Sequence, residues 1–126
     1  MVHVIESKKS IDEIAGALPG VIAKHKFGLI GFHDLKQKMN DKGVAFDREC
    51  RVFDVCNPNK AKAVLDRDMR VSTVLPCRIS AYQDGAGTKL AMVAPTTLLG
   101  LFGVPELQTE AEEVEATLLA IMREAA

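Results

Sequence analysis

The pattern of apolar and polar residues changes period several times along the chain, and each change predicts a new element. Val2 to Glu6 reads VHVIE and alternates, which predicts a strand. The next apolar residues recur every three or four positions, which predicts a helix from Ser10 to Lys24. Its first residue and Glu13 have the form of a capping box. Pro19 inside this pattern predicts a kink or break near Leu18, because proline removes a backbone donor.

The middle of the chain predicts two strands separated by a short helix. Phe27 to Phe32 reads FGLIGF, an almost wholly apolar run that is typical of a strand covered on both faces or nearly so. Asp34 is placed to cap a short helix over Leu35 to Asp41, and Gly43 is placed to end it. Val44 to Val55 then follows period two, with a change of phase near its end that indicates a bulge or a strand covered on both faces.

Two proline-containing stretches follow that strand. Cys56 is expected to end the strand, and Asn57-Pro58 to start a helix, because Asn is a preferred cap and Pro is favoured in the first turn. Val71 to Leu75 and Cys77 to Tyr82 are predicted to be extended chain, interrupted at Pro76.

The last third predicts a hairpin, a loop and a helix. Asp84 to Gly87 is a turn, and Lys89 to Ala94 returns as the partner strand. Thr96 to Pro105 is expected to be an apolar loop. The final helix is predicted from the spacing of its buried stripe, formed by Leu107, Ala111, Val114, Leu118, Ile121 and Met122. Residues 1–126 are therefore expected to form a single α+β domain with a curved, largely antiparallel sheet and helices packed mainly on one face.

Composition narrows the classes of function. The 126 residues carry 16 Lys and Arg against 17 Asp and Glu, for a net charge of −1. Without a basic patch we expect no nucleic-acid or membrane partner. No apolar run approaches the roughly 20 residues of a membrane span, and the N-terminus lacks a signal-peptide core, so we expect a cytoplasmic protein. The three cysteines form no CxxC and are expected to be reduced.

The order of motifs resembles a known family. FGLIGFHDL, KGVAFDRECRVFDVCNP and VLPCRISAY, followed by a glycine-containing turn and a Glu-rich helix, resemble the domain of unknown function 302 family of bacteria and archaea, in its cysteine-containing branch. The resemblance covers essentially the whole chain. It implies a small domain of the TATA-box-binding-protein-like fold class, often a homodimer, and it implies no reaction.

Cys56 and Cys77 form the candidate pair with the most specific chemistry. If their strands are neighbours, the side chains could come close enough for a disulfide or a shared soft metal. Cys56 also precedes a predicted helix N-terminus, where thiols are often reactive. The alternative is that both are core residues, since free cysteine is among the most buried residue types.

Three further residues are candidates. His33 could complete a Cys₂His site for zinc or copper, or serve as a base for a thiol, although it could also simply leave the sheet. Arg78 could bind an anion in a bidentate way on the sheet surface, or be an ordinary exterior charge. Asn57 lies beside Cys56 and joins the candidate set. The apolar Thr96 to Pro105 segment could be a lid, a dimer contact or a plug for the core.

Three hypotheses remain open. The first is a small homodimeric binding module that holds a small ligand, a metal or a sulfur species near Cys56, Cys77 and His33. The second is a thiol-based redox enzyme or sulfur carrier with Cys56 as the reactive thiolate. The third is a structural or interaction domain with every cysteine in the core. Nucleotide-binding loops and the motifs of serine hydrolases and zincins are missing from the sequence.

Overall fold

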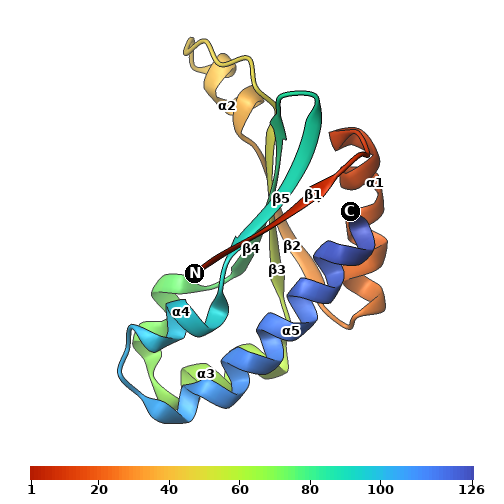
Figure 1. Ribbon diagram of the computed structural model, residues 1–126. Coiled ribbons are helices and arrows are strands. Elements are labelled where there is room, and N and C mark those ends of the chain that lie inside the picture. The colour runs from red at the N-terminus through yellow and green to blue at the C-terminus, as the bar shows by residue number, and fades with distance from the viewer.

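A computed structural model describes residues 1–126 and shows an α+β fold built on one antiparallel sheet (Figure 1). The five strands lie in the order β1-β5-β4-β3-β2. Their bounds are β1 Val2–Ser7, β2 Gly28–Asp34, β3 Cys50–Cys56, β4 Cys77–Asp84 and β5 Gly87–Val93. The helices are α1 Ile11–Lys24, α2 Leu35–Asp41, α3 Pro58–Arg67, α4 Pro95–Gly100 and α5 Gln108–Ala125, with 3₁₀ turns η1 Met69–Val74 and η2 Pro105–Leu107.

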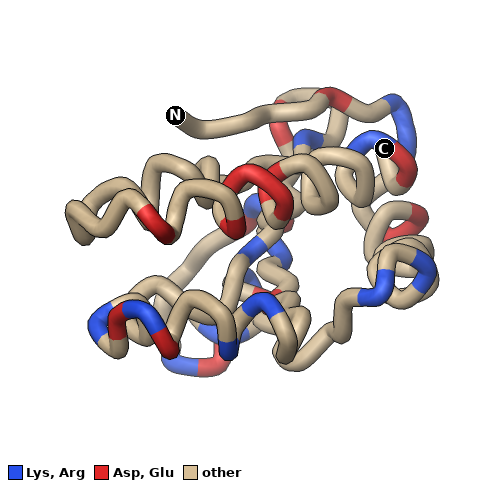
Figure 2. Tube along the Cα trace, turned by 90° about the horizontal axis from the view of Figure 1, so that it is seen from below, with Lys and Arg blue, Asp and Glu red and all other residues tan.

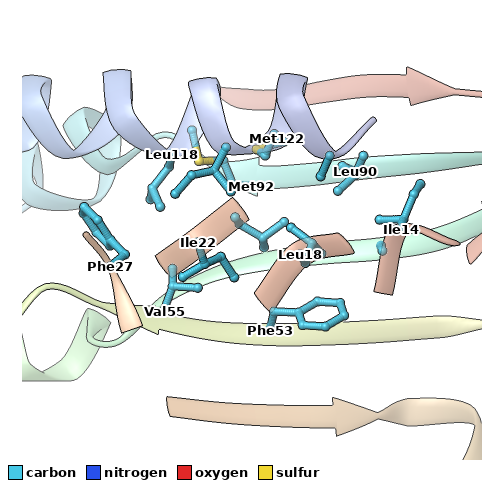
Figure 3. Close-up of a cluster of buried hydrophobic side chains, with 14 of the residues drawn as sticks. Ile14, Leu18, Ile22, Phe27, Phe53, Val55, Leu90, Met92, Leu118 and Met122 are labelled. Atoms are coloured by element: carbon cyan, nitrogen blue, oxygen red, sulfur yellow. The ribbon is translucent and has the colours of Figure 1, made fainter. Parts of the chain in front are cut away.

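Helices α1 and α5 cover one face of the sheet (Figure 1). The main core lies between them and the three central strands, as Figure 3 shows for ten labelled side chains. Its largest fully buried members include Leu18 of α1, Phe53 of β3 and Leu118 of α5. The predicted sheet, and helices placed mainly on one face, are confirmed.

A second, smaller core lies at one end of the sheet, where α3, α4, η1 and η2 gather around the first turns of α5. It consists of Val64, Val71, Leu99, Leu107 and Ala111. Helix α3 follows β3 and the turn η1 precedes β4, so the two cysteine-bearing strand ends lie next to this cluster.

Helix α1 starts as predicted, but the break predicted near Leu18 is absent. The Ser10 hydroxyl accepts from the Glu13 amide, and the Glu13 carboxylate accepts from the Ser10 amide, so the capping box forms. The helix nevertheless continues through Pro19 to Lys24 without a break. Burial of Ile14, Leu18 and Ile22 against the sheet holds the helix on both sides of the proline.

Strand β2 is an edge strand, so the prediction that both faces of FGLIGF are covered is wrong. It pairs only with β3, and a bulge lies between Leu29 and Gly31. Leu29, Ile30 and Phe32 are exposed, with Ile30 at 61% of its full exposure. An apolar run does not by itself distinguish a central strand from an edge strand.

The long strand predicted from Val44 is also corrected. Residues 44–49 form no regular structure, and β3 begins at Cys50. The change of phase has a simple cause, because Phe53, Asp54 and Val55 are three consecutive buried residues of a central strand. The bulge lies in the neighbouring β2.

Two segments predicted as irregular or extended are helical. Val71 to Leu75 lies largely in the 3₁₀ turn η1, and the apolar Thr96 to Pro105 segment contains most of helix α4. Both pack into the smaller core, which stabilises helical turns that a period-two or loop pattern does not predict. The short helix α2, the β4–β5 hairpin and the buried stripe of α5 are confirmed.

Basic and acidic positions are mixed over much of the trace, but α5 begins with a group of glutamates and has no basic residue before Arg123 (Figure 2). None of the helices is long and apolar enough to cross a membrane.

Candidate functional site

Cys56 and Cys77 meet at the end of the sheet because β3 and β4 are neighbours. Cys77 is the register partner of Val55, and Cys56 is the next residue along β3. Both cysteines are half-buried and neither forms a disulfide. They line the same small cavity together with apolar side chains of α3, α4 and α5.

This small cavity has a volume of about 50 Å³. A dry engineered cavity that binds benzene has about three times this volume, roughly 150 Å³. The space between the two cysteines is therefore too small for an organic ligand unless the surrounding helices move.

The Cys77 thiol lies in an environment that keeps it protonated. Burial raises the pKa of Cys77 to about 11, and the neighbouring Cys56 adds to the rise because two thiolates would repel each other. Thiolate is the form that attacks disulfides and binds soft metals. Cys77 is therefore a poor nucleophile, and its side chain acts as an apolar group that lines the cavity.

Asn57 stabilises the start of helix α3. Its side-chain oxygen accepts from the amides of Asn59 and Lys60 at 3.0 and 3.2 Å, so it caps α3. Its side-chain amide donates to the Lys26 carbonyl at 3.4 Å, which ties the helix to the end of the α1–β2 connection. These bonds occupy the polar groups of this candidate, which lines the small cavity beside Cys56 and lies outside the larger cleft beside Cys77.

A larger cleft opens on the other side of Cys77, where β4 and β5 separate. Pairing of these strands runs from Asp84 with Gly87 to Ser80 with Ala91 and stops there. Beyond it, the first residues of β4 pair with β3 alone, and the last residues of β5 pair with β1 alone. The cleft between them, which we call the Cys77 cleft, has a volume of about 280 Å³.

The Cys77 cleft is lined mostly by apolar side chains from β4, β5, η1, α4 and α5. Its lining consists of Thr73, Val74, Leu75, Pro76, Cys77, Arg78, Met92, Val93, Pro95, Leu98 and Leu118. Arg78 is the one charged residue among them. The volume is near the lower end of the roughly 300–1,000 Å³ typical of small-molecule sites.

The third arrangement is a row of polar side chains across β2, β3 and β4. Asp54 Oδ2 lies 2.8 Å from His33 Nε2, and Asp54 Oδ1 lies 3.2 Å from Arg78 Nε. Asp54 alternates with Phe53 and Val55, which face the helices, so the row lies on the opposite face. Lys38 Nζ lies 2.6 Å from His33 Nδ1. The His33 ring thus lies between the Asp54 carboxylate at Nε2 and the Lys38 ammonium at Nδ1.

Gly31 provides the space for Asp54. A Cβ at Gly31 would lie 2.6 Å from Asp54 Oδ2 and 3.1 Å from Asp54 Cβ, which is closer than atoms pack. The bare backbone of β2 therefore lets the Asp54 carboxylate lie across it toward His33. Neither Asp54 nor Gly31 is predicted from the sequence, since an aspartate inside an apolar strand and a glycine in the next strand form no spacing motif.

The candidates form two groups, with Cys77 and Arg78 adjacent at the start of β4. His33 is the partner of Val52, four residues along β3 from Cys56, which corresponds to roughly 13 Å. His33 thus joins Arg78 through Asp54 and does not reach the cysteines. No three His, Cys, Asp or Glu side chains are grouped so that they could hold a metal ion.

Comparison of the chain with known families and solved structures identifies its family. The family described as "Domain of unknown function DUF302" matches residues 3–125, so the chain belongs to this family. It is similar to the crystal structure of an "uncharacterized conserved protein DUF302" from Bacillus stearothermophilus, with 27% identity, a TM-score of 0.94, and coverage of 99% of this chain and 98% of that one. None of the curated proteins matches.

Proposed function

We propose that the protein is a small-molecule binding module whose ligand occupies the Cys77 cleft. The observation that carries the proposal is the separation of β4 from β5, which leaves an apolar cleft of about 280 Å³ beside Cys77. Apolar clefts with a few polar groups are the usual form of ligand sites. This places the ligand beside Cys77 and Arg78 and away from the small cavity that Cys56 and Cys77 share.

The role of Cys77 in this proposal is packing. Its raised pKa keeps the thiol neutral near pH 7, so the side chain adds apolar surface to the cleft. No turnover is needed, and the ligand binds and leaves unchanged.

The proposal is tested by blocking the cleft. Val93 lines it and is partly exposed, so phenylalanine there fills the space without entering the core. Val4, a partly exposed valine on β1 outside the cleft, gives the matched control Val4→Phe. Amide NMR spectra of the full chain are followed during titration with 1-hexanol and with hexanoate.

We expect saturable shifts around Cys77 and Met92 with at least one probe, loss of these shifts in Val93→Phe, and their retention in Val4→Phe. If neither probe gives saturable shifts, or if Val93→Phe binds as the wild type does, the cleft is not a ligand site.

A second candidate function is a thiol-based enzyme or sulfur carrier with Cys56 as the reactive group. Cys56 lies one residue before the cap of α3, and helix N-termini are a common environment of reactive cysteines. Its test is native mass spectrometry after purification. An added sulfur or a Cys56–Cys77 bond would support this candidate, and unmodified thiols would favour the binding module or a purely structural domain.

A further inference from the structure

We propose that the ligand of the Cys77 cleft is a small organic carboxylate, with its head group on Arg78 and its apolar chain in the cleft. This inference rests on the proposed function and names the class of ligand. It is carried by the position of a guanidinium with two unbonded terminal nitrogens at an otherwise apolar cleft.

Arg78 has unused hydrogen-bonding capacity. Its side chain is 65% exposed, and its one charged contact is the 3.2 Å approach of Nε to Asp54 Oδ1. No hydrogen bond joins its two terminal nitrogens to any group of the chain. Arg70, by contrast, donates to Asp68 and to the Phe102 carbonyl.

Asp54 lies against the Nε end of the Arg78 guanidinium and not against its two terminal nitrogens. The Asp54 side chain is 10% exposed, and its hydrogen bond goes from His33 Nε2 to Oδ2. Oδ1 is buried and accepts no hydrogen bond, because Arg78 Nε lies near it without pointing at it. Asp54 attracts the Nε end of the guanidinium through its charge, and the terminal nitrogens remain for a second anion.

The geometry of the free group selects a planar anion. Two terminal nitrogens of arginine match the two oxygens of a carboxylate in a bidentate pair. A phosphate dianion fits less well, because Arg78 is the sole charged residue of the cleft and the other walls could not balance a second charge.

The walls beyond Arg78 suit an apolar chain. Met92 and Leu118 are almost fully buried, and with Leu98 of α4 they form the inner surface of the cleft. Methionine is a flexible side chain that adapts to the shape of a bound group. A short, unbranched chain next to a carboxylate matches this combination.

The test compares hexanoate with 1-hexanol, which have the same chain length and differ in the head group. Dissociation constants are measured by NMR titration for the wild type and for Arg78→Gln, Arg78→Lys and Arg123→Gln. Arg123 is exposed on α5 outside the cleft, so its variant makes the same change in net charge.

We expect the wild type to bind hexanoate roughly tenfold more tightly than 1-hexanol, the size of one charge-assisted pair. Arg78→Gln should remove this preference, Arg78→Lys should retain part of it because the charge remains, and Arg123→Gln should leave it unchanged. Should Arg78→Gln not fold, the lysine variant still measures the loss of the bidentate pair.

The outcomes separate the two claims. Equal affinity for hexanoate and 1-hexanol in the wild type, or a preference that persists in Arg78→Gln, overturns the carboxylate assignment and leaves the cleft as a neutral ligand site. Binding of neither probe overturns the proposed function itself.

Discussion

Arg78 and Asp54 are register partners on neighbouring strands, and their side chains approach to 3.2 Å between Nε and Oδ1. Asp54 is also bonded to His33, one strand further on, so a single buried carboxylate connects β2, β3 and β4. The same carboxylate forms an ion pair with the guanidinium beside the Cys77 cleft. The ion pair thus links the fold of the sheet to the proposed binding site.

Gly31→Ala is expected to destabilise the protein, because the new Cβ would lie 2.6 Å from Asp54 Oδ2 and push the carboxylate away from His33. Loss of a buried charged hydrogen bond costs about 1–3 kcal/mol in the free energy of unfolding. Urea unfolding measures it. Gly20→Ala in α1 is the control, since nothing lies within 4 Å of its Cβ and alanine favours a helix. A neutral or stabilising Gly31→Ala would show that Asp54 is not held as described.

Asn57→Ala is expected to lower the free energy of unfolding by about 1 kcal/mol, because two amides of the first turn of α3 lose their acceptor. Asn57→Ser keeps a capping oxygen and should remain near the wild type. Neither variant should change the affinity for hexanoate. A change in the affinity for hexanoate at an unchanged free energy of unfolding would show that Asn57 takes part in ligand binding.

Cys77 is expected to react slowly with iodoacetamide, and Cys56 first. With its pKa raised to about 11, from about 8.5 for an ordinary cysteine, Cys77 has a thiolate fraction roughly three-hundredfold lower near neutral pH. Timed alkylation and peptide mass spectrometry of the native protein measure the order, with urea-unfolded protein as the control. Equal reactivity of the two thiols in the native protein would contradict this expectation.

The same thiol makes the stability depend on pH. The pKa of Cys77 is higher in the folded protein than the value of about 8.5 in an unfolded chain, so folding favours the protonated thiol. The contribution of Cys77 to the free energy of unfolding is fully present below about pH 8.5. It is lost as the pH rises toward 11, which lowers the free energy of unfolding by about 3 kcal/mol at most. Cys77→Ala should remove this part of the alkaline decline in urea unfolding. An identical decline in both proteins would contradict it.

The exposed apolar residues of edge strand β2 are expected to be covered by a second copy of the chain. Ile30 is 61% exposed beside Leu29 and Phe32, and an uncovered apolar edge is a site for association. Ile30→Lys should convert a dimer to a monomer in light scattering after size exclusion. Leu101→Lys, at a 75% exposed position on another part of the surface, is the control. A monomeric wild type would rule out this contact.

Much of the fold could be predicted because local signals agreed with the final packing. Ser10 and Asn57 cap the helices that their positions predict, and the stripe of α5 is buried as its spacing requires. The errors occur where tertiary context decides. FGLIGF has the composition of a central strand and lies at an edge, and the Thr96 to Pro105 segment becomes helical through burial of Leu99.

The site was predictable only in part. Proline and cysteine at two strand ends indicated that Cys56 and Cys77 could lie close together, and the two residues line one cavity. The sequence could not show that this cavity is small or that β4 and β5 separate beside Cys77. It also could not show that a buried aspartate forms an ion pair with Arg78. These features depend on register and on contacts between strands, which one sequence does not encode as a motif.

The most direct test of the account is the position of bound hexanoate in the wild-type protein. Intermolecular nuclear Overhauser effects are measured between the unlabelled ligand and protein labelled at its methionine and leucine methyl groups. The account predicts contacts from the ligand chain to Met92, Leu98 and Leu118, which line the Cys77 cleft. Contacts to leucines outside the cleft without these three, or no contacts at saturating hexanoate, would contradict it.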